Sequence, residues 1–403
     1  MRILVVATKA PWPAVDGGRL LLALTLEALV AAGHRLALVA PVDPGRFDPA
    51  EVGAALAPLC EPHLVAVRPT GRLASLARSR VTGTPLSVAR HTLPAVRREV
   101  LRVLREAAAG EGFDVVHAEQ LQAVPQAVAL GVSLVLRAQN VESDLWGAAS
   151  RRRGGLAGRL LASEARRLAA FEGDAVRRAA ATVALTAADA ARLAELAGAG
   201  ARVHAIAAPF PAHLPAGSTA LFGDPPVVVL GSAGWLPNAD SAAWFAGAVW
   251  PEVRRQLPAA VLHLFGEPGA AAAGAGVVGH PPPSDSAEAF APRSILAVPV
   301  RIASGVRMKV LEAWARGVPV VATPEAVAGL DAEHGREVLV AQDPAEFAAA
   351  LARLHREPAL GRALIAAGRA ALAARHEPAA VAARLTAIYQ EALSTSLVRG
   401  PLK

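Results

Sequence analysis

The sequence contains very little cysteine, few aromatic residues and no long apolar run. Cys60 is the single cysteine among 403 residues, and Phe, Trp and Tyr together make up 4%. One cysteine cannot form a disulfide within the chain and is typical of a reducing compartment. No apolar stretch is long enough to cross a bilayer, so we expect no spanning helix. The opening MRILVVATKAPWP does not resemble a signal peptide, because Lys9 and two prolines follow a short apolar stretch.

Length and charge narrow the class of protein further. A chain of 403 residues with 53% apolar residues is long for one core and fits two domains. The net charge of +7 comes mostly from arginine and suits nucleic acid, anionic lipid or anionic substrates. No helix-turn-helix, zinc-ligand or RNA-binding signature accompanies the charge, so we expect no nucleic-acid partner.

The chain begins the same pattern twice. Residues 2–8 form an apolar strand followed by a glycine-containing loop and a helix over 19–32. Residues 227–232 form another such strand, followed by a loop and a helix to about residue 256. Strand, loop and helix begun twice predict two Rossmann-like α/β domains in series. We place them at 1–205 and 227–377, with a Pro- and Gly-rich linker at 206–226.

Other elements follow from hydrophobic periodicity and turn residues. The further strands expected in the first half are 35–39, 113–117, 133–138 and 182–185. Those expected in the second half are 261–265, 277–278, 295–300, 318–322 and 338–340. The further helices expected are one ending near 109, a long Arg-rich region over 143–178, 344–356, one after Pro358, and 378–394.

The segment VPVRIASGVRMKVLEAWARGVPVVATP, residues 298–324, carries the chemistry. It predicts a strand, a glycine turn, a helix over 306–316 ending at Gly317, and a second strand. Gly305, Lys309, Glu312 and Arg316 fall on one polar stripe, and Val306, Val310, Ala313 and Trp314 form the apolar side.

A helix that starts after a glycine turn presents free N–H groups and a positive dipole end to a phosphate. Arg307 and Lys309 add positive charge at this end. Glu312 lies further along, where its carboxylate can accept hydrogen bonds from two sugar hydroxyls. The segment therefore predicts a site for a nucleotide sugar.

The segment resembles the donor-binding motif of the GT-B glycosyltransferases, in particular the retaining family 4, also labelled glycosyl transferase group 1. The matching residues are Gly305, Arg307, Lys309, Leu311, Glu312, Ala313, Ala315, Gly317, Pro319 and Thr323. One position departs from the family pattern, because Ser304 stands where many members carry a first glutamate.

The resemblance implies the GT-B fold, an α/β class with two Rossmann-like doubly wound domains facing a central cleft. Residues 378–403 are then the final helix that crosses back to the first domain. The implied function is transfer of a hexosyl unit from a nucleoside-diphosphate sugar to an acceptor hydroxyl, with retained configuration. The implied partners are the nucleotide sugar and a glycan, lipid-linked or small-molecule acceptor. No acidic pair is spaced to hold a metal, so we expect neither metal nor cofactor.

Further segments resemble family motifs in the first half. The loop AVDGG offers Gly17 and Gly18 near the donor phosphates and the acceptor. FDVVHAEQ places His117 at a strand end; a structural histidine there is an equal alternative. LRAQNVE carries Gln139 where a histidine is usual. The catalytic residues expected are Arg307, Lys309, His117 and Gln139.

In the second half, GSAGWLPN and the turn after HLF resemble segments that surround the donor. Glu267 and His280 are either base contacts or solvated loop residues. The donor-binding residues expected are Gly17, Gly18, Gly234, Gly266, Ser304, Gly305, Val306, Arg307, Lys309 and Glu312.

Several alternatives stay open. A sugar-nucleotide epimerase would share the fold, but it needs acids and bases around the sugar that are scarce here. A non-catalytic sugar-nucleotide-binding protein would fit Ser304 and Gln139. The arginine runs 151–153, 166–167 and 177–178 are a solvated face or, as in peripheral glycosyltransferases, a contact with anionic lipid. We therefore expect a cytoplasmic protein, with peripheral contact to the inner face of the membrane as a further expectation.

Overall fold

The chain forms two compact units, seen here in a computed structural model that describes residues 1–127, 131–218, 220–231, 236–266, 274–283, 285–302 and 304–399. The first unit comprises residues 1–13, 21–209 and 378–403, and the second comprises 14–20 and 210–377. The last helix of the chain therefore groups with the first unit. The short loop 14–20, which the sequence placed with the first domain, groups with the second.

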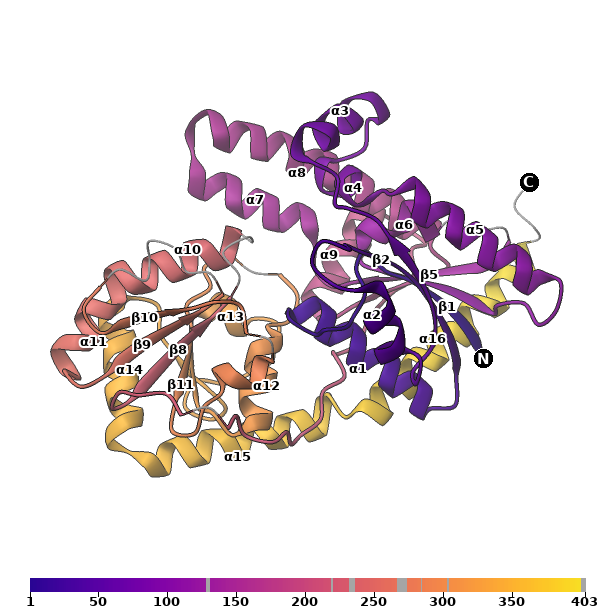
Figure 1. Cartoon of the computed structure of the whole chain (residues 1–403). Coiled ribbons are helices and arrows are strands. Elements are labelled where there is room, and N and C mark those ends of the chain that lie inside the picture. Colours follow the sequence, from indigo (N-terminus) through magenta and orange to yellow (C-terminus); the bar gives the residue numbers. More distant parts are fainter. Residues whose placement is uncertain are drawn as a thin grey trace. The chain divides into compact units, whose positions relative to one another are not determined.

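The first unit is built on a parallel sheet (Figure 1). Within the described residues its order is β3-β2-β1-β4-β5-β6-β7. The strands are β1 (Arg2–Val6), β2 (Arg35–Val42), β3 (Glu61–Ala66), β4 (Val115–Glu119), β5 (Ser133–Ala138), β6 (Ala181–Ala184) and β7 (Val203–Ala205). The chain winds outward in one direction from β1 to β3 and then in the other from β4. The winding therefore reverses between β1 and β4, which is where doubly wound sheets bind ligands.

Helices cover both faces of this sheet, as parallel strands require. They are α1 (Gly17–Ala31), α2 (Pro49–Leu56), α3 (Arg72–Thr82), α4 (Leu86–His91), α5 (Pro94–Ala108), α6 (Val124–Ala127), α7 (Glu142–Arg153), α8 (Gly155–Arg178), α9 (Ala187–Ala197) and α16 (Pro378–Arg399). The sequence was wrong in expecting one helical region over 143–178. Gly154 and Gly155, both at positive φ, divide it into α7 and α8.

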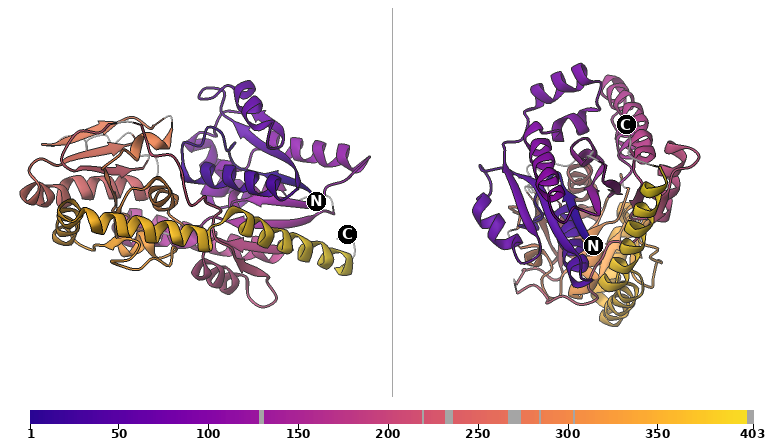
Figure 2. Two further views of the ribbon diagram at one scale, coloured as in Figure 1. Left: turned by 90° about the horizontal axis from the view of Figure 1, so that it is seen from below. Right: turned by 90° about the vertical axis from the view of Figure 1, so that its right-hand side faces the viewer.

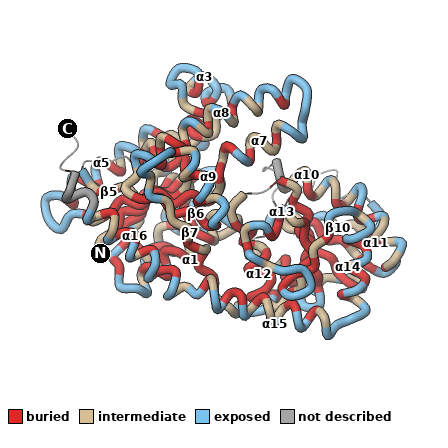
Figure 3. Tube along the Cα trace, turned by 180° about the vertical axis from the view of Figure 1, so that it is seen from behind, coloured by how far each residue is buried: buried red, intermediate tan, exposed pale blue. Residues whose placement is uncertain are grey.

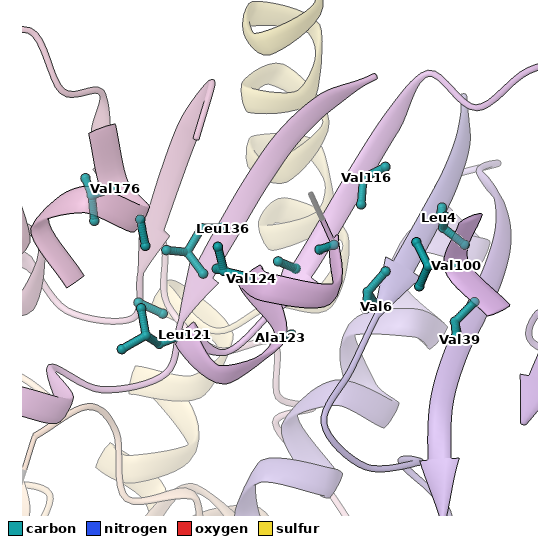
Figure 4. Close-up of a cluster of buried hydrophobic side chains, with 14 of the residues drawn as sticks. Leu4, Val6, Val39, Val100, Val116, Leu121, Ala123, Val124, Leu136 and Val176 are labelled. Carbon is teal, nitrogen blue, oxygen red and sulfur yellow. The ribbon is translucent and has the colours of Figure 1, made fainter. Parts of the chain in front are cut away.

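Alternating side chains of the first sheet build two cores. Leu4, Val6 and Val116 point to the face covered by α5 and α8, as the labelled side chains in Figure 4 show. Ile3 and Val5 point to the other face, where they pack with residues of α1 and α16. α16 lies against β4, β5 and β6 and is the yellow helix beside these strands in Figure 2.

The second unit repeats this plan. Within the described residues its parallel sheet has the order β10-β9-β8-β11-β12-β13. The strands are β8 (Pro226–Leu230), β9 (Val261–Phe265), β10 (Val277–His280), β11 (Ile295–Val298), β12 (Val320–Ala322) and β13 (Leu339–Val340). The winding reverses between β8 and β11. In Figure 3 the strands of both sheets are drawn as buried, and the outer turns of the helices as exposed.

The helices of the second unit pack on both faces of its sheet. They are α10 (Leu236–Trp244), α11 (Trp250–Gln256), α12 (Met308–Arg316), α13 (Pro324–Val327), α14 (Pro344–Arg356) and α15 (Pro358–Arg375). A π-helical turn, Phe245–Val249, joins α10 to α11. Phe245, Trp250 and Phe347 lie in the core on the α11 and α14 side.

Candidate functional site

A cavity lies at the carboxyl edge of the second sheet. Its volume is about 240 Å³. It is lined by Val229, Leu230, Gly231, Asn238, Ala239, Ser241, Ala242, Ala243, Leu264, Phe265, Pro299, Val300 and Lys309. These residues follow or end strands β8, β9 and β11, or lie on α10 and α12. The cavity is therefore beside the point where the winding of the sheet reverses, the usual ligand position in this architecture.

α12 begins at the edge of this cavity. Gly305, at φ 69°, lies in the left-handed region that favours glycine, and Arg307 is the N-cap residue. The sequence placed the helix start at residue 306, but the first helical residue is Met308. The helix ends at Gly317, at φ 78°, as expected. The apolar side is also as expected, since Val310, Ala313 and Trp314 are fully buried.

Lys309 is the positively charged residue of the cavity lining. Its ammonium group donates a hydrogen bond to the carbonyl oxygen of Leu230, the last residue of β8. Burial lowers the pKa of Lys309 to about 7, and the Arg307 guanidinium contributes in the same direction. A lysine in this state gains charge when an anion approaches, because the anion raises the lysine pKa again.

Arg307 lies largely buried at the start of α12, with 7% of its surface exposed. Its guanidinium donates to the carbonyl oxygen of Ser304 and so folds back over the turn that precedes the helix. Arg307 and Lys309 thus place two basic groups at a helix N-terminus, where the helix dipole also favours an anion.

Glu312, one turn further along α12, is 3% exposed. Its Oε1 accepts from Ser286 Oγ at 2.5 Å and from Arg316 Nε at 2.9 Å. Burial raises the pKa of Glu312, while Ser286 and Arg316 act against this rise. The expected polar stripe therefore contains an internal ion pair, and Ser286 is a partner that the sequence did not indicate.

Asn238, on α10, packs closely on the end of β8. A Cβ added to Gly231 would lie 2.6 Å from Asn238 Cγ, so only glycine allows this approach. Asn238 and Ser241 add amide and hydroxyl groups to the cavity lining. The sequence suggested Asn238 at the rim or as a helix cap, and it did not single out Ser241.

The loop 14–20 belongs to the same unit as this cavity. A Cβ on Gly17 would lie 3.3 Å from the Cβ of Met308, the first residue of α12. Gly17 is thus close to the phosphate-binding end expected for α12. The next residue, Gly18, lies in the first turn of α1.

In the first unit, a buried polar network lies at the ends of β4 and β5. Glu119 pairs with Arg137, with Oε2 and Nη2 2.7 Å apart, and both side chains are about 2% exposed. Arg137 also donates to Thr25 Oγ1 at 2.5 Å. Burial alone raises the pKa of Glu119, but Arg137 and His117 outweigh it and hold the pKa at about 2.

His117 is part of this network rather than a surface residue. It is 1% exposed; its Nε2 lies 3.0 Å from Glu119 Oε2, and its Nδ1 lies 2.8 Å from the Tyr389 hydroxyl. Burial lowers the pKa of His117 below its usual value. The sequence expected this ring to face a ligand, whereas both ring nitrogens have partners inside the unit. A catalytic role for His117 stays a prediction.

Gln139 lies at the border of the network. Its Nε2 donates to Glu119 Oε1 at 2.7 Å, and its Oε1 accepts from Gln120 Nε2 at 2.8 Å. Gln120 in turn accepts from Thr8 Oγ1 at 2.6 Å. Thr8, Gln120 and Gln139 follow the ends of β1, β4 and β5, where the winding of the first sheet reverses. The sequence missed Thr8 and Gln120, although their positions after strand ends were a usable signal.

Comparison with known families assigns the second unit. Residues 225–357 match the family model described as Glycosyl transferases group 1. This segment is a glycosyl transferases group 1 domain. The glycosyltransferase domain expected from residues 298–324 is thereby confirmed. No curated protein sequence matches the chain significantly.

Solved structures resemble the whole chain. Sucrose-phosphate synthase from Thermosynechococcus elongatus is 16% identical, with 98% of this chain and 100% of that chain covered and a TM-score of 0.70. HepE from Anabaena in complex with UDP-glucose is 13% identical, with the same coverage and a TM-score of 0.58. TarM from S. aureus is 10% identical over 73% of this chain and 58% of that chain, with a TM-score of 0.55. The α/β fold class of GT-B type is confirmed.

The expected donor-binding residues fall into three groups relative to the cavity of the glycosyl transferases group 1 domain. Lys309 lines the cavity, and Ser304, Gly305, Val306, Arg307 and Glu312 lie on α12 or the turn before it. Gly266 follows β9, next to Phe265 of the lining, and donates its N–H to the His280 carbonyl at 3.1 Å. Gly234 and Glu267 lie outside the described residues.

Two features were looked for across the described part of the chain. None of its helices is both long and apolar enough to cross a membrane. Over the same residues, no group of three or more His, Cys, Asp or Glu side chains is placed to hold a metal ion.

Proposed function

We propose that the protein transfers a hexosyl unit from a nucleoside-diphosphate sugar to an acceptor hydroxyl. The observation that carries this proposal is the position of Lys309, which lines a cavity at the winding reversal of the glycosyl transferases group 1 domain. The complex of HepE with UDP-glucose adds support from a protein of similar fold.

In this proposal the diphosphate lies at the start of α12. Arg307, Lys309 and the helix N-terminus would stabilise the negative charge that builds on the departing diphosphate, an electrostatic contribution to catalysis. Lys309 suits this role because its pKa of about 7 lets it take up a proton as the charge develops. Gly305 gives the diphosphate close access to the backbone at this turn.

We assign Glu312 to the ribose hydroxyls of the donor. In the structure its carboxylate is held by Ser286 and Arg316, which fix its position on the buried side of α12. A carboxylate already oriented in this way loses little freedom on binding. Ser286 and Arg316 then act as positioning residues for Glu312.

The first unit is proposed to bind the acceptor. Gln139 is the residue that we expect to contact it, with Gln120 and Thr8 beside it in one hydrogen-bonded chain. These amide and hydroxyl groups both donate and accept, which suits sugar hydroxyls. TarM was solved with an α-GlcNAc-glycerol and a glycan analogue, which makes a glycan or a small polyol a reasonable acceptor class.

Retained configuration and independence from metal are further parts of the proposal. Both rest on the motif around Arg307, Lys309 and Glu312. No protein base is assigned, because His117 is buried and has partners at both nitrogens. The leaving diphosphate would then take the proton of the acceptor.

The decisive experiment is incubation of the purified protein with a panel of nucleotide sugars, with and without added sugar acceptors. Transfer, or slow hydrolysis of one donor, supports the proposal. Interconversion of donor sugars without transfer would favour an epimerase. Tight donor binding without turnover would favour a non-catalytic binding protein. The Gln139→His variant separates the last case, because restored turnover would trace the defect to that one position.

We also propose a peripheral contact with anionic lipid, through the surface formed by Leu73, Leu76, Val81, Leu156 and Leu160. These side chains of α3 and α8 are 44–87% exposed. Arg167 of α8 ties the two helices together, because its guanidinium donates to Ser79 at the end of α3 and to Thr84 beyond it. Leu156 and Leu160 flank Arg159, and the run 151–153 immediately precedes them in the chain. Exposed leucines among arginines suit an anionic lipid surface.

A further inference from the structure

A column of four aromatic rings stands behind the wall of the cavity. Phe265 lines the cavity, and His280 stacks on it with ring centres 4.2 Å apart and planes at 9°. His263 stacks next, 5.2 Å from His280 at 27°. Phe222 closes the column edge-on to His263, at 5.2 Å and 81°. The column links the segment before β8 to the cavity lining.

Hydrogen bonds fix the protons on the two histidines. His263 Nε2 lies 2.9 Å from the carbonyl oxygen of Phe222, which can only accept, so Nε2 carries the hydrogen. The Nδ1 of a neutral His263 is then an acceptor. It lies 2.9 Å from His280 Nε2, which must therefore donate. Both rings are neutral and carry the proton on Nε2.

The surroundings keep the pair neutral. His263 is fully buried, and burial lowers its pKa, although its bond to Phe222 opposes the change. Burial also lowers the pKa of His280; His263 adds to this effect and Glu288 opposes it. Asp224, two residues beyond Phe222, forms its ion pair with Arg293 instead.

A proton added to His263 Nδ1 would point at the N–H of His280. Two donors would then face each other across 2.9 Å. The bond between the rings would be lost, and His280 would no longer be held flat against Phe265. Acidification therefore acts on the wall of the cavity through His263.

We propose that His263 and His280 are positioning residues that hold Phe265 as a flat wall for the planar base of the donor, and that protonation of His263 releases this wall. The proposal rests on the nucleotide-sugar function proposed above. It adds a specificity element for the base that lies away from Arg307, Lys309 and Glu312.

The first test needs no ligand. Long-range proton–nitrogen NMR spectra of the intact protein at pH 7.5 report the tautomer of each histidine ring. We expect the Nε2–H tautomer for both His263 and His280, assigned by the loss of signals in His263→Gln and His280→Phe. A proton on Nδ1 of His263, or a charged ring at this pH, would overturn the proposal.

The second test measures uridine affinity between pH 5.5 and 7.5 by ligand-observed NMR. Uridine carries no phosphate, so the titration of Lys309 and of a diphosphate does not enter. We expect the wild-type affinity to fall as the pH drops. His280→Phe keeps the stacked ring but removes the hydrogen bond to His263, so its affinity at pH 7.5 should be kept and its pH dependence lost.

His280→Gln keeps an N–H donor but removes the ring. Because stacking of a base on an aromatic side chain contributes about 1–3 kcal/mol, its uridine affinity should fall roughly tenfold at every pH. His213→Gln, an exposed histidine of the same unit, is the control and should behave like the wild type. Thermal melting of each variant confirms that it is folded.

The outcomes separate this proposal from the proposed function. A flat wild-type pH profile, or one unchanged in His280→Phe, would reject the histidine wall while UDP binding still supported the donor site. Binding of UDP without any uridine binding would reject the base wall alone. Failure to bind UDP at any pH would reject the donor site itself, and the wall with it.

Discussion

The hydroxyl of Tyr389 donates a hydrogen bond to His117 Nδ1 over 2.8 Å. The direction follows from the other ring nitrogen, because Nε2 faces the carboxylate of Glu119 at 3.0 Å and must carry the hydrogen. Tyr389 is fully buried on α16, and His117 ends no solvent path. This bond therefore fastens the last helix of the chain to the centre of the first sheet.

Tyr389→Phe should lower the free energy of unfolding by about 1–3 kcal/mol, because it leaves His117 Nδ1 buried without a donor. Denaturant titration of the full chain measures the effect. UDP affinity should not change, since the donor is assigned to the second unit. Gln390→Ala, at the exposed neighbouring position, is the matched control. A variant as stable as the wild type would show that the hydroxyl bond contributes nothing.

Acid should weaken the first unit through Glu119. Its folded pKa of about 2 lies below the model value of 4.5, so its stabilisation is complete above pH 4.5 and is lost as the pH falls toward 2. The difference of about 2.5 pKa units corresponds to roughly 3 kcal/mol. The lowered pKa of His117 acts in the same direction below pH 6.5. Unfolding free energies measured between pH 7 and pH 3 test this slope.

Glu119→Gln removes the titrating group from the same network. It should be less stable than the wild type at pH 7 by about 3–5 kcal/mol, because Arg137 stays buried without its counter-charge. Its stability should also depend less on pH below 4.5. An equally steep acid slope in this variant would place the responsible carboxylate elsewhere.

UDP binding should be coupled to proton uptake by Lys309. With a pKa near 7, the free amine is partly deprotonated at pH 7.5, and the diphosphate would raise its pKa on binding. Calorimetry in buffers of different ionisation enthalpy should therefore show uptake of a fraction of a proton, larger at pH 8 than at pH 7. Lys309→Arg, which stays charged, should bind UDP without uptake. Equal uptake in both proteins would assign the proton to another group.

Glu312→Gln should weaken UDP binding by about 1–3 kcal/mol, the scale of a lost hydrogen bond to a charged group. Glu333→Gln, at an exposed carboxylate of the same unit, should leave the affinity unchanged. Because Glu312 also pairs with Arg316, the melting temperature of each variant should be recorded beside the affinity. Unchanged UDP affinity with a lower melting temperature would make Glu312 a structural residue.

Binding to lipid vesicles should require both charge and the exposed leucines. We expect flotation with vesicles that contain phosphatidylglycerol but not with pure phosphatidylcholine, and weaker flotation at high salt. Leu73→Ser combined with Leu156→Ser should reduce binding. Replacing the run 151–153 by glutamine should cost about 1 kcal/mol per arginine.

The matched control for the vesicle experiment uses Arg177 and Arg178. Both pair with Asp174 on α8, so their replacement by alanine should have little effect. If this control lost binding as strongly as the leucine variant, the contact would be a general charge effect rather than a defined surface. Equal binding of all variants would remove the lipid contact.

The sequence determined those parts of the fold that depend on local patterns. β5, β9 and α14 begin and end where hydrophobic periodicity and turn residues place them. The glycine turn, the apolar side of α12 and its end at Gly317 were equally readable. Each of these features depends on side-chain period or backbone conformation within about ten residues, and such information is present in the chain itself.

Only the tertiary structure decided which side chains meet. Glu312 is joined to Ser286, His117 to Tyr389, and His263 to His280, across 26, 272 and 17 residues. No local pattern encodes such pairs, because sheet order and helix packing bring them together. The burial that follows from packing also set the low pKa of Lys309 and closed His117 off from solvent. Residue type and spacing thus predicted the chemistry available, while packing determined which groups are left to perform it.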